Sequence, residues 1–116
     1  MNPPGVIDEQ VFAELQDSAG ADFVAELVGS FLDDAPALLA ALAAAAAYGD
    51  ADAFRRCAHT VKSNAHTFGA TALADAARAL EHTPLTDLGA DAGPRVAALR
   101  GLYDAAAAVL QGRRHA

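Results

Sequence analysis

The chain has 116 residues, 53% of which are hydrophobic, and its formal net charge is −7. This length suits one globular domain with a sizeable core, and the acidic balance excludes non-specific binding to nucleic acid, which depends on lysine and arginine neutralising phosphates. A single cysteine excludes an internal disulfide, and the N-terminus lacks the basic and apolar parts of a signal peptide. We therefore expect a cytoplasmic protein.

The first predicted helix is short. Most of the apolar content is alanine and leucine, which favour helices. After the proline- and glycine-containing start of the chain, Asp8 can cap a helix that carries Val11, Phe12 and Leu15 on its apolar face. Gly20 ends this pattern.

A long amphipathic helix is predicted from Asp22, because apolar residues recur there at spacings of three and four. Pro36 lies inside this helix and predicts a kink, since proline removes one helical hydrogen bond. The most apolar run, residues 38–48, is too short for the roughly 20 residues of a membrane span, so we expect a core helix and no membrane contact.

The third predicted helix follows a turn at Gly49, which suits a left-handed cap, and Asp50 or Asp52 can begin it. It runs to about Phe68, where Gly69 is placed to end it. Its expected core stripe consists of Phe54, Cys57, Val61, Ala65 and Phe68.

A fourth helix is predicted with Leu73, Ala77 and Leu80 on one face. The passage from 82 to 94 is rich in turn residues, and Pro94 suits the first position of a last helix. The buried face of that last helix is expected to hold Val96, Leu99, Leu102, Tyr103, Ala106, Val109 and Leu110.

Together these elements predict an all-α protein, an antiparallel four-helix bundle with a short additional N-terminal helix. Residues 1–116 form one domain in this interpretation, with residues 1–7 and 112–116 as flexible ends, and we expect a monomer. Met1 and the short tails favour a free-standing protein over an excised domain of a larger one.

The third helix carries polar residues on the side opposite its core stripe. At about 100° per residue they lie between about 100° and 220° from Val61. A solvated polar face would by itself account for this arrangement. The sign of the charge favours a site for an anion, because this face is basic in an acidic protein. Its residues are Arg55, Arg56, His59, Lys62, Ser63 and His66.

The fourth helix is expected to bring a carboxylate to this face. Helices joined by a tight turn are normally antiparallel, so positions pair symmetrically about the turn. Reflection about residue 70 places His59 opposite Glu81, with Arg78 on the neighbouring turn. The carboxylate could fix the tautomer of the ring and leave the other nitrogen free as a nucleophile. A simple interhelical hydrogen bond is the alternative.

The sequence gives less support for a functional role of the remaining histidines and the cysteine. His66 could steer a partner or be merely solvated, and His82 and His115 have no evident partner. His59 and His66 lie about 10 Å apart along the helix axis, too far for one zinc ion with bonds of about 2.1 Å, so no metal site is predicted. Cys57 is interpreted as core packing rather than a redox centre.

The stretch AHTVKSNAHTFGA, with the later ARALE, closely resembles the motif of histidine-containing phosphotransfer (Hpt) domains. That motif has a histidine, a lysine three residues on, small residues, and a glycine ten residues after the histidine. The resemblance extends to what look like the family's second and third helices, including the proline in the middle of the former. Ser63 departs from the pattern, because many members have glycine there; serine is also small, so we expect a partner's access to be preserved.

The resemblance implies that His59 accepts a phosphoryl group from an aspartyl phosphate on a receiver domain and passes it to a second receiver. Lys62 would neutralise the phosphate charge, and Glu81 would orient His59. The implied partners are receiver domains of response regulators or a hybrid sensor histidine kinase. The protein would be a carrier rather than an enzyme, without a cofactor of its own, since the receiver supplies Mg²⁺. Residues expected on the binding face are Ser63, His66, Arg55, Arg56 and Arg78.

A helical scaffold is the alternative, including a degenerate Hpt-like module that binds a receiver without phosphotransfer. The intact set of His59, Lys62 and Glu81 favours the carrier, because a degenerate module would have no reason to keep a nucleophile and its neighbours together.

Overall fold

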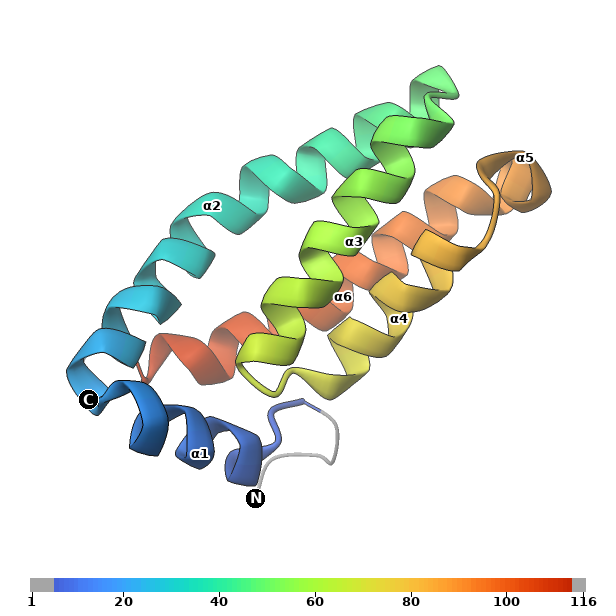
Figure 1. The fold of residues 1–116 in the computed structure, drawn as a ribbon. Coiled ribbons are helices and arrows are strands. Elements are labelled where there is room, and N and C mark those ends of the chain that lie inside the picture. Colours follow the sequence, from blue (N-terminus) through green and yellow to red (C-terminus); the bar gives the residue numbers. More distant parts are fainter. Residues whose placement is uncertain (1–5, 114–116) are drawn as a thin grey trace.

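The computed structural model describes residues 6–113, and every regular element in that range is helical. Among the four long helices, α3 packs against α2 and α4, and α6 contacts α2 and α4, which closes the ring. Figure 1 shows these helices as an elongated bundle with alternating directions and α1 at one end. The predicted all-α class is confirmed. The elements are α1 (Glu9–Ala19), α2 (Ala21–Tyr48), α3 (Ala51–Thr67), α4 (Thr71–His82), α5 (Leu85–Leu88), the 3-10 turn η1 (Gly89–Asp91) and α6 (Ala92–Gln111).

The ends of the first three helices follow local rules that the sequence displays. The Asp8 carboxylate accepts hydrogen bonds from two backbone N–H groups in the first turn of α1. Gly20 separates α1 from α2 with φ of 94°, and Gly49 ends α2 in the left-handed conformation. Asp50 then caps α3 by accepting from the Ala53 N–H. These four predicted boundary positions are confirmed.

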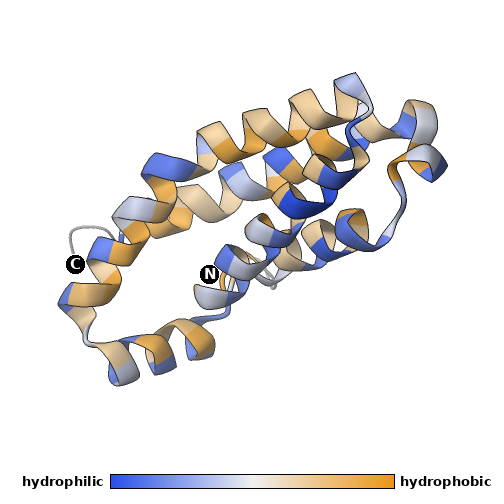
Figure 2. Ribbon diagram, turned by 45° about the horizontal axis from the view of Figure 1, so that its top comes forward, coloured by the Kyte–Doolittle hydropathy of each residue, from blue (hydrophilic) through white to orange (hydrophobic). Residues whose placement is uncertain are grey.

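The long helix α2 continues through Pro36 without a break. In Figure 2 its second half is coloured almost entirely as hydrophobic. By length and composition alone it could cross a membrane, since an 18-residue stretch within it has a mean hydropathy of 1.5. Nine of its residues are buried, however, and it packs against α3 and α6, so the bundle core accounts for much of its apolar character.

Aromatic rings from three helices meet in the core. Phe31 of α2 stacks on Phe68 at the end of α3, with ring centroids 5.3 Å apart, and meets Tyr103 of α6 edge-on at 5.8 Å. The predicted stripe of α3 is buried except at Cys57, which is half-buried beside the fully buried Ala58. Burial raises the pKa of the Cys57 thiol, as expected for a packed rather than a reactive cysteine.

The passage from 82 to 94 is more ordered than the sequence analysis predicts. It contains α5 and η1, because Leu85 and Leu88 are buried in the core and fold the segment back onto the bundle. The last helix begins at Ala92, so Pro94 is its third residue and not its first. Proline is tolerated there because the first four N–H groups of a helix have no partner within it.

Residues near both ends of the described range contact the rest of the domain. Ile7 is buried, and the next N–H along the chain, that of Asp8, donates to the Gly69 carbonyl at 2.7 Å. Arg113 donates to both carboxylate oxygens of Glu9 and lies over the ring of Phe12. Positions 7 and 113, which the sequence assigns to the ends of the domain, therefore contact the rest of the bundle. Residues 1–5 and 114–116, with His115 among them, lie outside the described range.

The Gly69→Ala variant is expected to lower the free energy of unfolding by about 2–4 kcal/mol. Gly69 has φ of 74°, and a Cβ there would lie 2.8 Å from the Asp8 carbonyl oxygen and 3.1 Å from the Val11 Cβ. The matched control is Gly49→Ala, since Gly49 has φ of 72° but nothing within 4 Å of the added atom. This variant should lower the free energy of unfolding by only about 1–2 kcal/mol, the cost of placing an alanine in the left-handed conformation. The measurement is urea unfolding of both variants. Equal losses of stability would show that the close approach of Asp8 and Val11 to Gly69 does not matter.

Candidate functional site

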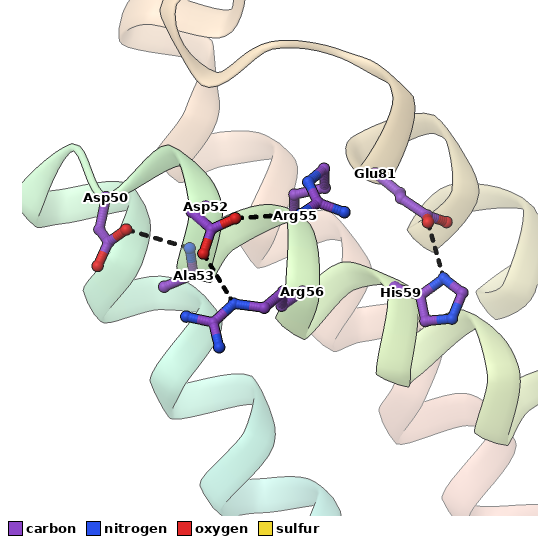
Figure 3. Close-up of polar contacts among 7 residues, drawn as sticks. All are labelled: Asp50, Asp52, Ala53, Arg55, Arg56, His59 and Glu81. Carbon is purple, nitrogen blue, oxygen red and sulfur yellow. Dashed lines mark hydrogen bonds and ion pairs between the residues drawn. The ribbon is translucent and has the colours of Figure 1, made fainter.

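The antiparallel pairing of α3 and α4 places an imidazole against a carboxylate. The Nδ1 atom of His59 lies 2.7 Å from Oε2 of Glu81, and Figure 3 shows the two side chains pointing toward one another across the helix interface. Their exposure differs strongly. The His59 side chain is 55% exposed, whereas that of Glu81 is 12% exposed. The ring is therefore accessible from solvent, while the group that holds it is largely covered.

The other oxygen of the same carboxylate binds the chain's only lysine. Nζ of Lys62 lies 2.6 Å from Oε1 of Glu81, and the lysine side chain is only 20% exposed. Oε1 is buried and accepts no well-angled hydrogen bond, so the contact with Lys62 is best described as an ion pair. Glu81 thus bridges the ammonium and the imidazole, one oxygen to each.

This environment keeps Glu81 ionised. The Lys62 ammonium beside Oε1 is the largest cause that lowers the pKa of Glu81 from 4.5 to about 2, and His59 adds to it against an opposing effect of burial. Since its pKa is depressed, the stabilisation from ionised Glu81 is present above about pH 4.5 and is lost as the pH falls toward 2. A carboxylate can only accept, so in neutral His59 the proton lies on Nδ1 and the lone pair on Nε2.

The arginines near the start of α3 are engaged elsewhere. Arg55 and Arg56 both contact Asp52, each at 3.0 Å, as Figure 3 shows. All three side chains are more than half exposed, so these ion pairs are weak and can be exchanged for other partners. The pairing leaves one positive charge in excess in this cluster.

The remaining predicted site residues lie on the surface. Ser63, His66 and Arg78 are exposed, and their side chains form no ion pair or hydrogen bond with another described residue. The structure therefore brings together His59, Glu81 and Lys62, and leaves the other predicted residues around them as separate surface groups.

A hollow of about 430 Å³ is lined in part by Glu81 but not by His59 or Lys62. It opens between the first turns of α3 and the segment that follows α4, and it is mostly apolar. Within residues 6–113 no group of three or more His, Cys, Asp or Glu side chains is arranged to hold a metal ion. The lining residues are Ala51, Asp52, Phe54, Arg55, Glu81, His82, Thr83, Pro84, Leu85 and Thr86.

Comparison with known families identifies the family to which this chain belongs. The model of the Hpt domain matches residues 26–109, which is well over half of the chain. The chain belongs to the Hpt domain family. No curated protein and no solved structure matches it. The matched range includes all of α3 and α4, and therefore His59, Lys62 and Glu81.

Membership of the family gives the class of activity. Hpt domains are phosphocarrier modules of phosphorelays and interact with receiver domains. The Hpt domain described here has the helical bundle of its family and an exposed histidine on the outer face of α3.

Three ion pairs around the site of this Hpt domain were not predicted from the sequence: Lys62 with Glu81, and Arg55 and Arg56 with Asp52. Reflection about the α3–α4 turn places Lys62 opposite Arg78, a like charge, so it gives no hint that the lysine reaches Glu81. Only the length and flexibility of a lysine stem allow this contact. The pairing of Asp52 with the two arginines does have a local signal, because it follows the spacing of three and four on one helix.

Proposed function

We propose that this Hpt domain carries a phosphoryl group on His59 between aspartates of receiver domains. The observation that carries the proposal is the exposed imidazole whose Nδ1 is held by a covered, ionised carboxylate. This arrangement leaves Nε2 as the nucleophile on an exposed ring.

The transfer is a nucleophilic substitution at phosphorus. The Nε2 lone pair of His59 forms a bond to the phosphorus of an aspartyl phosphate, and the bond from phosphorus to the aspartate oxygen breaks to release a carboxylate. The Nδ1 proton remains hydrogen-bonded to Glu81, which stabilises positive charge on the phosphorylated ring. The reverse reaction with the aspartate of a second receiver restores neutral His59. The receiver is expected to supply Mg²⁺.

The surface around His59 suits an anionic group on an approaching partner. A phosphoryl group carries about −1.5 to −2 charges near neutral pH, and Arg55, Arg56 and Arg78 can move toward it because they are exposed. Ser63 lies one turn beyond His59 and is small, which leaves room for the partner, while His66 extends the same face. We infer that the domain acts as a monomer in the cytoplasm, where receiver domains are found.

The scaffold alternative makes a different prediction about where the phosphoryl group goes. We expect that mixing the protein with a labelled, phosphorylated receiver transfers label to this chain, up to one phosphoryl group per molecule. A scaffold would bind the receiver while all label stays on the aspartate or is released as inorganic phosphate. The measurement is separation of the two proteins by size after brief mixing, with the label counted in each.

A further inference from the structure

The chain's only lysine has a partner that makes its role in the site specific. The Lys62 ammonium meets Oε1 of Glu81 at 2.6 Å, and four-fifths of the lysine side chain is covered. The same carboxylate meets His59 through Oε2. Lysine and histidine are thus joined through Glu81, with no direct contact between their polar atoms among the described interactions.

We propose that Lys62 is a positioning residue that acts on His59 through Glu81, rather than by neutralising the phosphoryl group directly. The effect on transfer rate rests on the function proposed above. The effect on the imidazole tautomer does not, because it is a property of the unphosphorylated domain.

Lys62 fixes the orientation of the Glu81 carboxylate. A carboxylate held at one oxygen can rotate about its last side-chain bond, and the hydrogen bond to Nδ1 then loses its direction. With Lys62 on Oε1, both oxygens are fixed and Oε2 stays aimed at the ring. Oε1 is buried and has no hydrogen bond of its own, so removal of Lys62 would leave it unpartnered. The side chain would then turn toward water to recover hydration.

Direct neutralisation of the phosphoryl group by Lys62 would be costly. To meet a phosphoryl group on Nε2, the ammonium would have to leave a covered, ionised carboxylate that depends on it. Breaking a buried pair by removing one partner is strongly unfavourable. Arg78 is exposed and without an ion pair to a described residue, so it is free to approach the phosphoryl group at much lower cost.

The test is a double-mutant cycle read by nitrogen NMR of His59 near pH 8. Lys62→Met keeps most of the stem and removes the ammonium. We expect it to shift the ring from mainly Nδ1–H toward the tautomer mixture of free histidine. In a Glu81→Gln background the same change should have no further effect. Arg78→Met is the control that removes a positive charge from the neighbouring helix without touching Glu81, and it should leave the tautomer unchanged.

A second readout uses phosphoramidate as a small phosphoryl donor, so no receiver is involved. Lys62→Met should slow acceptance by about tenfold in the wild-type background and by less than about twofold with Glu81→Gln. Lys62→Arg should retain most of the rate, because a guanidinium can also pair with the carboxylate. Circular dichroism checks that every variant is folded.

Two results would overturn the proposal. One is an unchanged His59 tautomer in folded Lys62→Met. The other is the same loss of rate from Lys62→Met in both backgrounds, which would mean that lysine acts independently of Glu81. Failure of phosphoryl acceptance in the wild type would instead count against the proposed function, and the tautomer measurement would still decide the role of Lys62.

Discussion

The His59→Gln variant is expected to lose phosphoryl acceptance completely while keeping its fold. Glutamine has no nucleophilic nitrogen, because its amide lone pair is delocalised, so no phosphoramidate can form. The ring it replaces is 55% exposed and lies opposite the core stripe of α3, so helical content and melting temperature should change little. The measurement is label from a phosphorylated receiver retained on the purified chain.

The control for this variant is His82→Gln, which removes an exposed histidine at the end of α4. It should accept label as the wild type does. The label on the wild type should be labile in acid and stable in alkali, as expected of phosphohistidine. Wild-type labelling of the His59→Gln chain would place the phosphoryl group on another residue and remove the basis of the site.

The Glu81→Ala variant is expected to slow phosphoryl acceptance by about 10- to 100-fold, the usual range when a group that orients a reacting side chain is lost. Its carboxylate is the only described partner of the His59 ring, and removal leaves the ring free to rotate. Glu81→Gln should be milder, because the amide oxygen can still accept from Nδ1 but lends the ring less basicity. The measurement is the initial rate of label transfer at matched protein concentrations.

The same pair of variants has a readout that does not depend on transfer. The spectra are recorded near pH 8. Nitrogen NMR should find the proton mainly on Nδ1 in the wild type and a mixture close to free histidine in Glu81→Ala. An unchanged tautomer ratio in the alanine variant would mean that the 2.7 Å contact does not orient the ring.

The parts of the fold that the sequence predicts are those decided by neighbours in the chain. Asp8 and Asp50 cap helices through N–H groups two or three residues away, and Gly49 ends α2 through its own backbone freedom. The contact between His59 and Glu81 joins residues further apart in the sequence. It can still be predicted, because a short turn makes α3 and α4 antiparallel and positions then pair symmetrically about that turn. For these features no knowledge of the core is needed.

The parts that the sequence misses depend on what a segment packs against. The passage after α4 looks like a loop by composition, but burial of Leu85 and Leu88 folds it into two short helical pieces. Ile7 and Arg113 look like ends, but Ile7 is buried in the core and Arg113 pairs with Glu9 of α1. The N–H of Asp8, which follows Ile7, donates to Gly69 in the α3–α4 turn. The reach of Lys62 to Glu81 depends on a side-chain conformation that spacing does not specify. Tertiary packing decides each of these cases.

The central claim is that one phosphoryl group passes through His59 on its way between two aspartates. The most direct test mixes a labelled, phosphorylated receiver with a second, unlabelled receiver, with and without this protein. The account predicts that label reaches the second receiver only when the protein is present, and that label trapped on the protein midway maps to His59. Transfer supported equally well by the His59→Gln chain would contradict the account, as would label that never leaves the first receiver.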